Sequence, residues 1–166
     1  MISILLWFHL FTYYNYYNNI NYNNINDDFL KYKLSNNGFS LKYTNSTIQN
    51  NYDYVLISVI QNGLALKFAS NKLQNNTNII FHAVFQNGLA LRYTSDYFKN
   101  NTVITHTAVS NNGFALMYTS DYIQNNKLIV LSAIFNKPKS IIYIHNDLKY
   151  NPDIIYIANK YNIEIY

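Results

Sequence analysis

Residues 88–112 read GLALRYTSDYFKNNTVITHTAVSNN, and residues 113–137 read GFALMYTSDYIQNNKLIVLSAIFNK. The two stretches align without a gap, glycine on glycine and Asn-Asn on Asn-Asn. The same pattern begins at Gly38 and at Gly63, so four copies of 25 residues follow one another. A divergent fifth copy begins at Pro138, where glycine is due. A fixed period of this kind predicts a repeat architecture in which each unit packs on the next.

The period divides the chain into a leading segment and an array. Residues 1–26 are apolar and then rich in Asn and Tyr, and we expect them to be partly disordered or to cap the array. Residues 27–166 form the array, which ends in a C-terminal cap. Its parts are a half repeat at 27–37 and repeats at 38–62, 63–87, 88–112, 113–137 and 138–162.

Equivalent positions of successive units should stack in space, so pure columns predict a core. One column is aliphatic, one is aromatic and one contains small residues. The column of small residues fits a close approach of two helices. The aliphatic column is Leu41, Leu66, Leu91, Leu116 and Ile141, the aromatic one is Tyr43, Phe68, Tyr93, Tyr118 and Tyr143, and the small one is Ser58, Ala83, Ala108, Ala133 and Ala158.

Two secondary structures compete for the unit. Asn-Gly between β-branched runs is typical of a hairpin turn, so an array of β-hairpins is the alternative. Helices explain more of the pattern, because Ile79, Ile80, Ala83 and Val84 have the spacing i, i+1, i+4, i+5. The Asn pairs provide helix N-caps between two halves of each unit. We therefore predict an all-α fold, a short α-solenoid of 25-residue helix-turn-helix repeats with helices of about three turns.

The glycines are expected to end the second helix of each unit in the left-handed conformation, where a Cβ is strained. This assignment covers Gly38, Gly63, Gly88 and Gly113. Proline cannot adopt that conformation, so Pro138 predicts a change of geometry and the start of the C-terminal cap.

The motif Asn-Gly-[Leu/Phe]-Ala-Leu, followed by an aromatic residue, Asn-Asn and an apolar helix, resembles a known family. It is similar to the tandem repeat of the domain-of-unknown-function series, number four-one-one-six. The matching segments are residues 62–70, 87–95 and 112–120, with a weaker copy at 37–45. The resemblance implies a helical repeat array of the kind found in large-genome DNA viruses of protists, in protists and in some bacteria. It implies no activity and no catalytic residues.

Composition excludes several classes of protein. There are 12 basic and 8 acidic residues, and the net charge of +4 is too small to predict the basic face of a nucleic-acid binder. The chain contains no cysteine, which excludes disulfides, thiolate metal sites and Cys nucleophiles. The 29 asparagines, with abundant Ile, Tyr and Lys, indicate an AT-rich genome.

Catalytic and metal sites are not predicted. The histidines are His9, His82, His106 and His145, and no two occupy the same position of the repeat. His82 and His106 are expected to be neighbours on adjacent second helices, yet no third ligand accompanies them. The acids fall at turns and helix starts, where capping explains them. We therefore expect no enzyme, no metal and no cofactor.

One column offers a binding surface. Lys42, Lys67 and Arg92 precede the aromatic residues Tyr43, Phe68 and Tyr93, which places cations beside rings along the array. We expect a non-enzymatic module that binds a protein or acts as a scaffold, its oligomeric state being open. The alternative is weak binding of a nucleic acid or another anion through the same stripe.

The location follows from the N-terminus. Residues 1–14, MISILLWFHLFTYY, lack a basic start and a small-residue cleavage site, and they are too short to span a bilayer. We expect a cytoplasmic protein, in the host cytoplasm if it is viral, and no membrane partner. Anchoring or export through residues 1–14 is the alternative.

Overall fold

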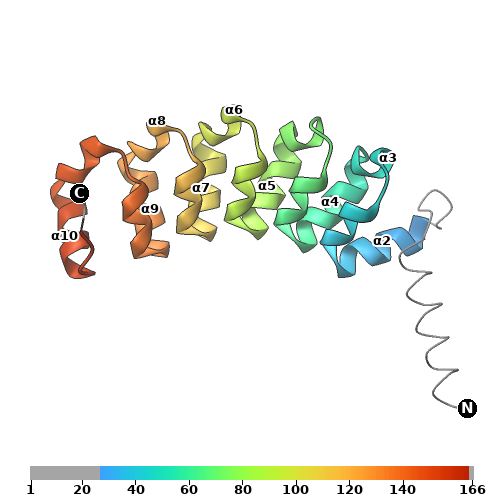
Figure 1. Cartoon of the computed structure of the whole chain (residues 1–166), viewed down its shortest axis with the longest axis horizontal. Helices are drawn as coiled ribbons and strands as arrows, with labels where there is room; N and C mark the ends of the chain where they lie inside the picture. Colours follow the sequence, from blue (N-terminus) through green and yellow to red (C-terminus); the bar gives the residue numbers. More distant parts are fainter. Residues whose placement is uncertain (1–26, 165–166) are drawn as a thin grey trace, which may run out of the picture.

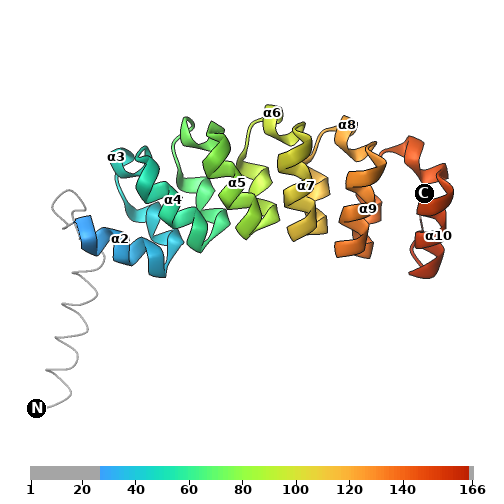
Figure 2. The ribbon, with the colours of Figure 1, turned by 180° about the vertical axis from the view of Figure 1, so that it is seen from behind.

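The computed structural model describes residues 27–164. Within them it contains helices and no strand, so the predicted α-solenoid is confirmed and β-hairpins are not formed in this part of the chain. The long helices stand side by side in chain order and build a single extended row (Figures 1 and 2). They are α2 (Asp27–Asn36), α4 (Tyr52–Gln61), α5 (Thr77–Gln86), α7 (Thr102–Asn111), α9 (Lys127–Asn136) and α10 (Pro152–Lys160).

The first half of each unit differs from the predicted three-turn helix. It consists of a six-residue 3-10 helix, a link of two to four residues that begins in an extended conformation, and a second short helical turn. The 3-10 helices are η2 (Gly38–Tyr43), η3 (Gly63–Phe68), η5 (Gly88–Tyr93), η6 (Gly113–Tyr118) and η7 (Pro138–Tyr143). The short turns are α3 (Ser46–Gln49), η4 (Leu73–Asn75), α6 (Asp96–Lys99), α8 (Asp121–Gln124) and η8 (Asn146–Tyr150).

Side-chain hydrogen bonds favour the break in the first half, although Ala69 and Ile144 have similar extended angles without a hydroxyl. Thr94 has extended angles, φ −94° and ψ 163°, and its hydroxyl donates to the carbonyl of Leu91 at 2.9 Å. Side chains of this kind compete with the helix for backbone partners.

In three units the side-chain amide of a glutamine also donates to backbone carbonyls at the end of the 3-10 helix. Gln124, for example, donates to the carbonyls of Leu116 and Thr119. A continuous helix is therefore replaced by two short pieces.

The Asn pairs cap the long helices as predicted. Asn101 accepts hydrogen bonds from the backbone amides of Val103 and Ile104 at 3.1 and 3.0 Å, and Asn76 and Asn126 repeat this arrangement. A second set of asparagines caps the 3-10 helices, as Asn87 does by accepting from Leu89. Asn therefore has a structural use at two positions in the first four units, whereas Lys137 precedes the last 3-10 helix without a side-chain cap.

The predicted left-handed glycines are wrong, because no glycine among the described residues has positive φ. Each glycine instead begins a 3-10 helix, after the long helix has ended one residue earlier on an extended Asn. The glycine packs against the next long helix. A Cβ on Gly88 would lie 2.1 Å from the carbonyl oxygen of Ala108, which is closer than any real contact. The expected close approach at the small-residue column is confirmed.

Pro138 does not change the local backbone. Lys137, which precedes it, has φ −141° and ψ 99°, close to the −146° and 108° of Asn112 before Gly113. Proline fits because the left-handed conformation that it cannot adopt is not required there, and because Tyr161 replaces the side-chain amide that accepts this N–H in the other units. The local backbone at residue 138 is therefore unchanged, whereas the last junction differs as expected, because α10 does not pack closely on α9 as the other long helices do on their neighbours.

Side-chain amides join consecutive long helices at their C-terminal ends. Gln86 accepts from the N–H of Gly63 at 2.6 Å and donates to the carbonyl of Gln61 at 3.3 Å. Gln61, Asn111 and Asn136 make the same pair of bonds in their units. Tyr161 stands at this position in the last unit and has no amide, so the last junction lacks the link.

The core runs without interruption along the array. The aliphatic column from Leu41 to Ile141 is fully buried, and the inner faces of the long helices complete it with residues such as Ile80, Val84 and Ile134. One unit alone leaves such a face exposed, and stacking covers it. The division of the chain into the units given above stays a prediction.

Candidate binding surface

Two rows of side chains lie side by side along the 3-10 helices, as the sequence predicted. We call Tyr43, Phe68, Tyr93, Tyr118 and Tyr143 the aromatic ladder, and Lys42, Lys67 and Arg92 the basic row. The ladder residue ends each 3-10 helix and the cation directly precedes it. Backbone stacking of identical units thus places similar groups in register.

Each cation of the basic row lies near the ring that follows it. The Lys42 ammonium is 5.4 Å from the ring centre of Tyr43, and that of Lys67 is 5.9 Å from Phe68. The Arg92 guanidinium lies 4.9 Å from the ring of Tyr93 and 5.8 Å from the ring of Tyr118 in the next unit. Such contacts orient a cation without using up its hydrogen-bond donors.

The basic row is exposed and uncompensated. Lys42, Lys67 and Arg92 are solvent-exposed, and none forms an ion pair with a residue in the range 27–164. The same position is occupied by Met117 and Ile142 in the next two units, which are 43% and 60% exposed. The surface is therefore basic along its first three units and apolar along the last two.

The ladder rings are anchored and still accessible. Tyr43 is 64% exposed, while Phe68, Tyr93, Tyr118 and Tyr143 are half-buried and pack against the core on one side. Two neighbours add edge-to-face contacts, Phe39 with Phe68 at 5.9 Å and Phe114 with Tyr143 at 6.5 Å. In the described part of the chain, the hydroxyls of the four tyrosines have no hydrogen-bond partner. They are available to a ligand.

A groove opens beside the third and fourth rungs. It has a volume of about 570 Å³ and is lined by Arg92, Tyr118, Met117, Lys99, Asp96 and Asp121 among others. Lys99 is paired with Asp96 at 2.9 Å. The groove therefore contains an unpaired guanidinium, an aromatic wall and one carboxylate, Asp121, without an ion pair in the described residues.

A second surface was missed by the sequence reasoning. The outward faces of α4 and α5 carry Ile60, Phe81 and Phe85, which we call the outer patch. Ile60 is 51% and Phe85 is 65% exposed, and the rings of Phe81 and Phe85 stack at 6.3 Å. The spacing of four residues between Phe81 and Phe85, opposite the buried face of the same helix, could have revealed the patch.

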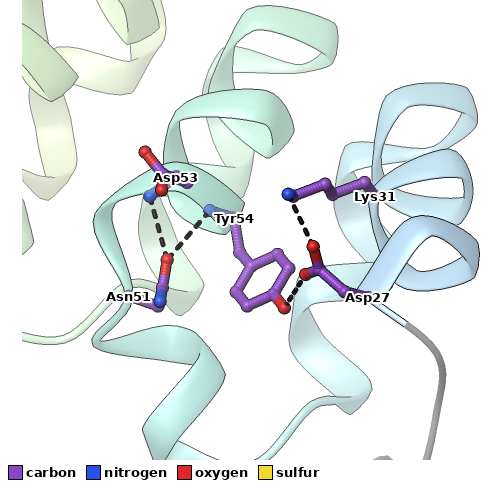
Figure 3. A network of polar contacts seen from close by, with 5 residues as sticks. All are labelled: Asp27, Lys31, Asn51, Asp53 and Tyr54. Atoms are coloured by element: carbon purple, nitrogen blue, oxygen red, sulfur yellow. Dashed lines mark hydrogen bonds and ion pairs between the residues drawn. The ribbon is translucent and has the colours of Figure 1, made fainter.

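A polar network fixes the first long helix to the second (Figure 3). The Asp27 carboxylate accepts from the Lys31 ammonium at 2.7 Å and from the hydroxyl of Tyr54 on α4. The hydrogen bond from Lys31, and then that from Tyr54, lowers the pKa of Asp27 below its usual value. The same contact with Asp27 raises the pKa of Tyr54. The network therefore links α2 to α4.

The three histidines within residues 27–164 make separate contacts. His106 lies 3.2 Å from the hydroxyl of Ser132, His82 contacts the ring of Phe81, and His145 caps η8 beside Asp147. His9 lies outside the described residues. Within 27–164, no three His or acidic side chains gather in a way that could hold a metal ion.

None of the helices between residues 27 and 164 combines the length and the apolar character needed to cross a bilayer. The hypothesis of an anchor in residues 1–14 concerns residues that the structure does not describe.

Comparison with known proteins identifies one family. The model described as Domain of unknown function (DUF4116) matches four overlapping stretches, residues 26–74, 53–99, 76–124 and 104–149. Each stretch covers about two of the 25-residue units. Neither the curated proteins nor the solved structures contain a significant match.

Proposed function

Since this chain belongs to the DUF4116 repeat family, whose function is not known, we propose from its surfaces that it is a non-enzymatic module that binds a protein partner. Family membership supports the fold, and a function has to come from the surface chemistry. A repeat array is suited to such a role because stacking builds an extended surface from equivalent positions.

The observation that carries the proposal is the pairing of the basic row with the aromatic ladder. Exposed Arg and Tyr are enriched at the centres of protein interfaces, where rings supply contact area and cations supply direction. Lys67 and Arg92 are exposed and lack carboxylate partners in the described residues, and anchored rings flank them. The surface is therefore ready to receive a partner with little rearrangement.

The outer patch gives the proposal a second candidate surface. Stacked, exposed rings such as Phe81 and Phe85 are uncommon on a protein with no partner. Variants in each surface can separate the two. The full-length chain is immobilised as wild type, as Lys67→Glu with Arg92→Glu, as Phe81→Ser with Phe85→Ser, and as the control Lys160→Glu.

Quantitative affinity capture from the native cell or host then tests the proposal. We expect the wild type and Lys160→Glu to recover the same protein, and one of the two double variants to lose it. Equal recovery by all four chains, together with a measured hydrolase or transferase activity, would contradict a binding role.

The second candidate is a single-stranded nucleic acid, because rings stack on bases and cations neutralise phosphates. Three phosphate contacts predict that affinity for a single strand falls about 20-fold between 50 and 200 mM salt. Anisotropy of a labelled oligothymidine measures this dependence. Absence of binding at 50 mM salt removes the candidate.

The expected compartment is the cytoplasm, and residues 1–14 supply the alternative of an anchor or export sequence. Fusing those residues to a fluorescent reporter decides between the two. Diffuse fluorescence fits the cytoplasm, and a membrane or secreted reporter fits the alternative.

A further inference from the structure

From the rows along the 3-10 helices we infer that the partner is a protein segment in the polyproline II conformation, with an acidic residue at every third position over the basic row and apolar residues beyond it. This inference rests on the proposed binding function and adds the chemistry and conformation of the partner. Spacing, free donors and charge each lead to it.

The first argument is the spacing of the rows. From α2 to α9 the neighbouring long helices pack directly on each other, as do the 3-10 helices that carry the basic row, and packed helices lie about 8–10 Å apart (Figure 1). Lys42, Lys67 and Arg92 should therefore follow one another at about that distance. A polyproline II segment presents the same face every three residues, about 9.3 Å along its axis. An extended strand does so after about 6.7 Å, which does not match.

The second argument is the set of unpaired donors. The carbonyls of a polyproline II segment have no internal hydrogen bonds and need donors from outside. The hydroxyls of Tyr93, Tyr118 and Tyr143 are such donors, since they have no partner among residues 27–164. An α-helical segment would leave them without acceptors, because its own amides occupy its carbonyls. Aromatic surfaces also favour proline, whose ring packs flat on theirs.

The third argument is the charge along the array. Three exposed cations without ion pairs call for three acidic residues, and the exposed Met117 and Ile142 call for apolar ones. Asp121 lies in the groove beside Arg92 and opposes an acidic ligand there, while Asp96 is paired with Lys99. Removing the Asp121 charge should therefore strengthen binding.

The probe is a fluorescein-labelled peptide of sequence (Asp-Pro-Pro)₃-(Leu-Pro-Pro)₂, titrated with the full-length chain and followed by anisotropy. One control peptide has Asn in place of each Asp, and another has Gly in place of each Pro. We expect saturable binding of the probe and at least about fivefold weaker binding of both controls, since they lose charge pairing and preorganisation respectively.

Variants of the chain locate the site. Lys67→Glu should weaken binding of the probe by at least about fivefold, Asp121→Asn should tighten it by about twofold, and Lys160→Glu should leave it within about twofold of wild type. Lys160 is matched in charge and lies on α10, away from the basic row. Circular dichroism of each variant verifies that the fold is retained.

Several results would overturn the inference. One is that the Asn or Gly control peptide binds as tightly as the probe, and another is that Lys160→Glu weakens binding as much as Lys67→Glu does. The inference also fails if a helical peptide with an acid at every seventh residue, or oligothymidine bound through Lys67, binds more tightly than the probe. A probe that does not bind, while Lys67→Glu with Arg92→Glu still loses the captured partner, sinks this inference and leaves the proposed function standing.

Discussion

Glycine recurs every 25 residues because this position of the unit has no space for a Cβ. Gly88 lies against the last turn of α7, where its hypothetical Cβ would meet the carbonyl oxygen of Ala108 at 2.1 Å. That oxygen already accepts the N–H of Asn112, which ends the helix. Neither backbone can move away without breaking this end of the unit.

We expect Gly88→Ala to lower the free energy of unfolding by about 2 kcal/mol or more, through steric overpacking. Gly88→Asn should destabilise at least as much, although left-handed positions tolerate asparagine. Urea denaturation measures both, with Ser110→Ala on the exposed face of α7 as the control. An Asn variant as stable as wild type would restore the left-handed assignment.

Asp27 makes the stability of the first helix depend on pH. Its folded pKa lies below the ordinary value near 3.8, because the charged form is held by Lys31 and Tyr54. The resulting stabilisation is fully present above the unfolded pKa and disappears as pH falls through the folded pKa. The wild type should therefore exceed Asp27→Asn in stability at pH 6, and the difference should close by about pH 2.

Thermal unfolding across this pH range checks the expectation. Tyr54→Phe removes only the contact with the hydroxyl, so it should reproduce part of the Asp27→Asn effect. A difference between wild type and Asp27→Asn that is independent of pH would show that the carboxylate charge does not act in this tie.

The hydrogen bonds between consecutive units lie mainly at the ends of the helices. At the C-terminal ends, side-chain amides such as that of Gln86 bridge two long helices. On the opposite side of the unit, the amide of Ser70 donates to the carbonyl of Gln49 at 2.8 Å, and His145 repeats the bond to Gln124. Each junction is thus held in register by polar bonds as well as by the core.

We expect Gln86→Ala to cost about 1–3 kcal/mol, because the buried N–H of Gly63 loses its acceptor. Gln86→Glu should cost less, since a carboxylate still accepts from Gly63 although it cannot donate to Gln61. Chemical denaturation of both variants, with Asn71→Ala at an exposed site as the control, tests the order. Equal stability of Gln86→Ala and wild type would show that the Gln86 amide does not stabilise the junction.

The sequence predicted those parts of the array in which the pattern of apolar residues reflects burial in the core. The long helices could be predicted because Ile79, Ile80, Ala83 and Val84 make a buried stripe, and the Asn pairs marked their starts. The 3-10 helices could not. The residues GLALRY fit either type of helix, and the choice depends on contacts with α7 and on the extended Thr94.

The candidate surface was predicted in part. The columns placed Lys42, Lys67 and Arg92 beside rings, and the structure brings these residues together in that order. The outer patch and the groove at Asp121 were missed, because both depend on which faces remain uncovered after stacking. Sequence periodicity identifies equivalent positions and does not by itself say which of them face solvent.

If the units stack in one line, equivalent residues lie at regular intervals along the array. The chain has no cysteine, so single pairs can be introduced for spin labels without other changes. Dipolar spectroscopy on Lys42→Cys paired in turn with Arg92→Cys, Met117→Cys and Ile142→Cys measures the row directly. The distances should grow by about 8–10 Å with each added unit. Distances that do not increase with the number of intervening units would contradict the stacked array and the continuous binding surface built on it.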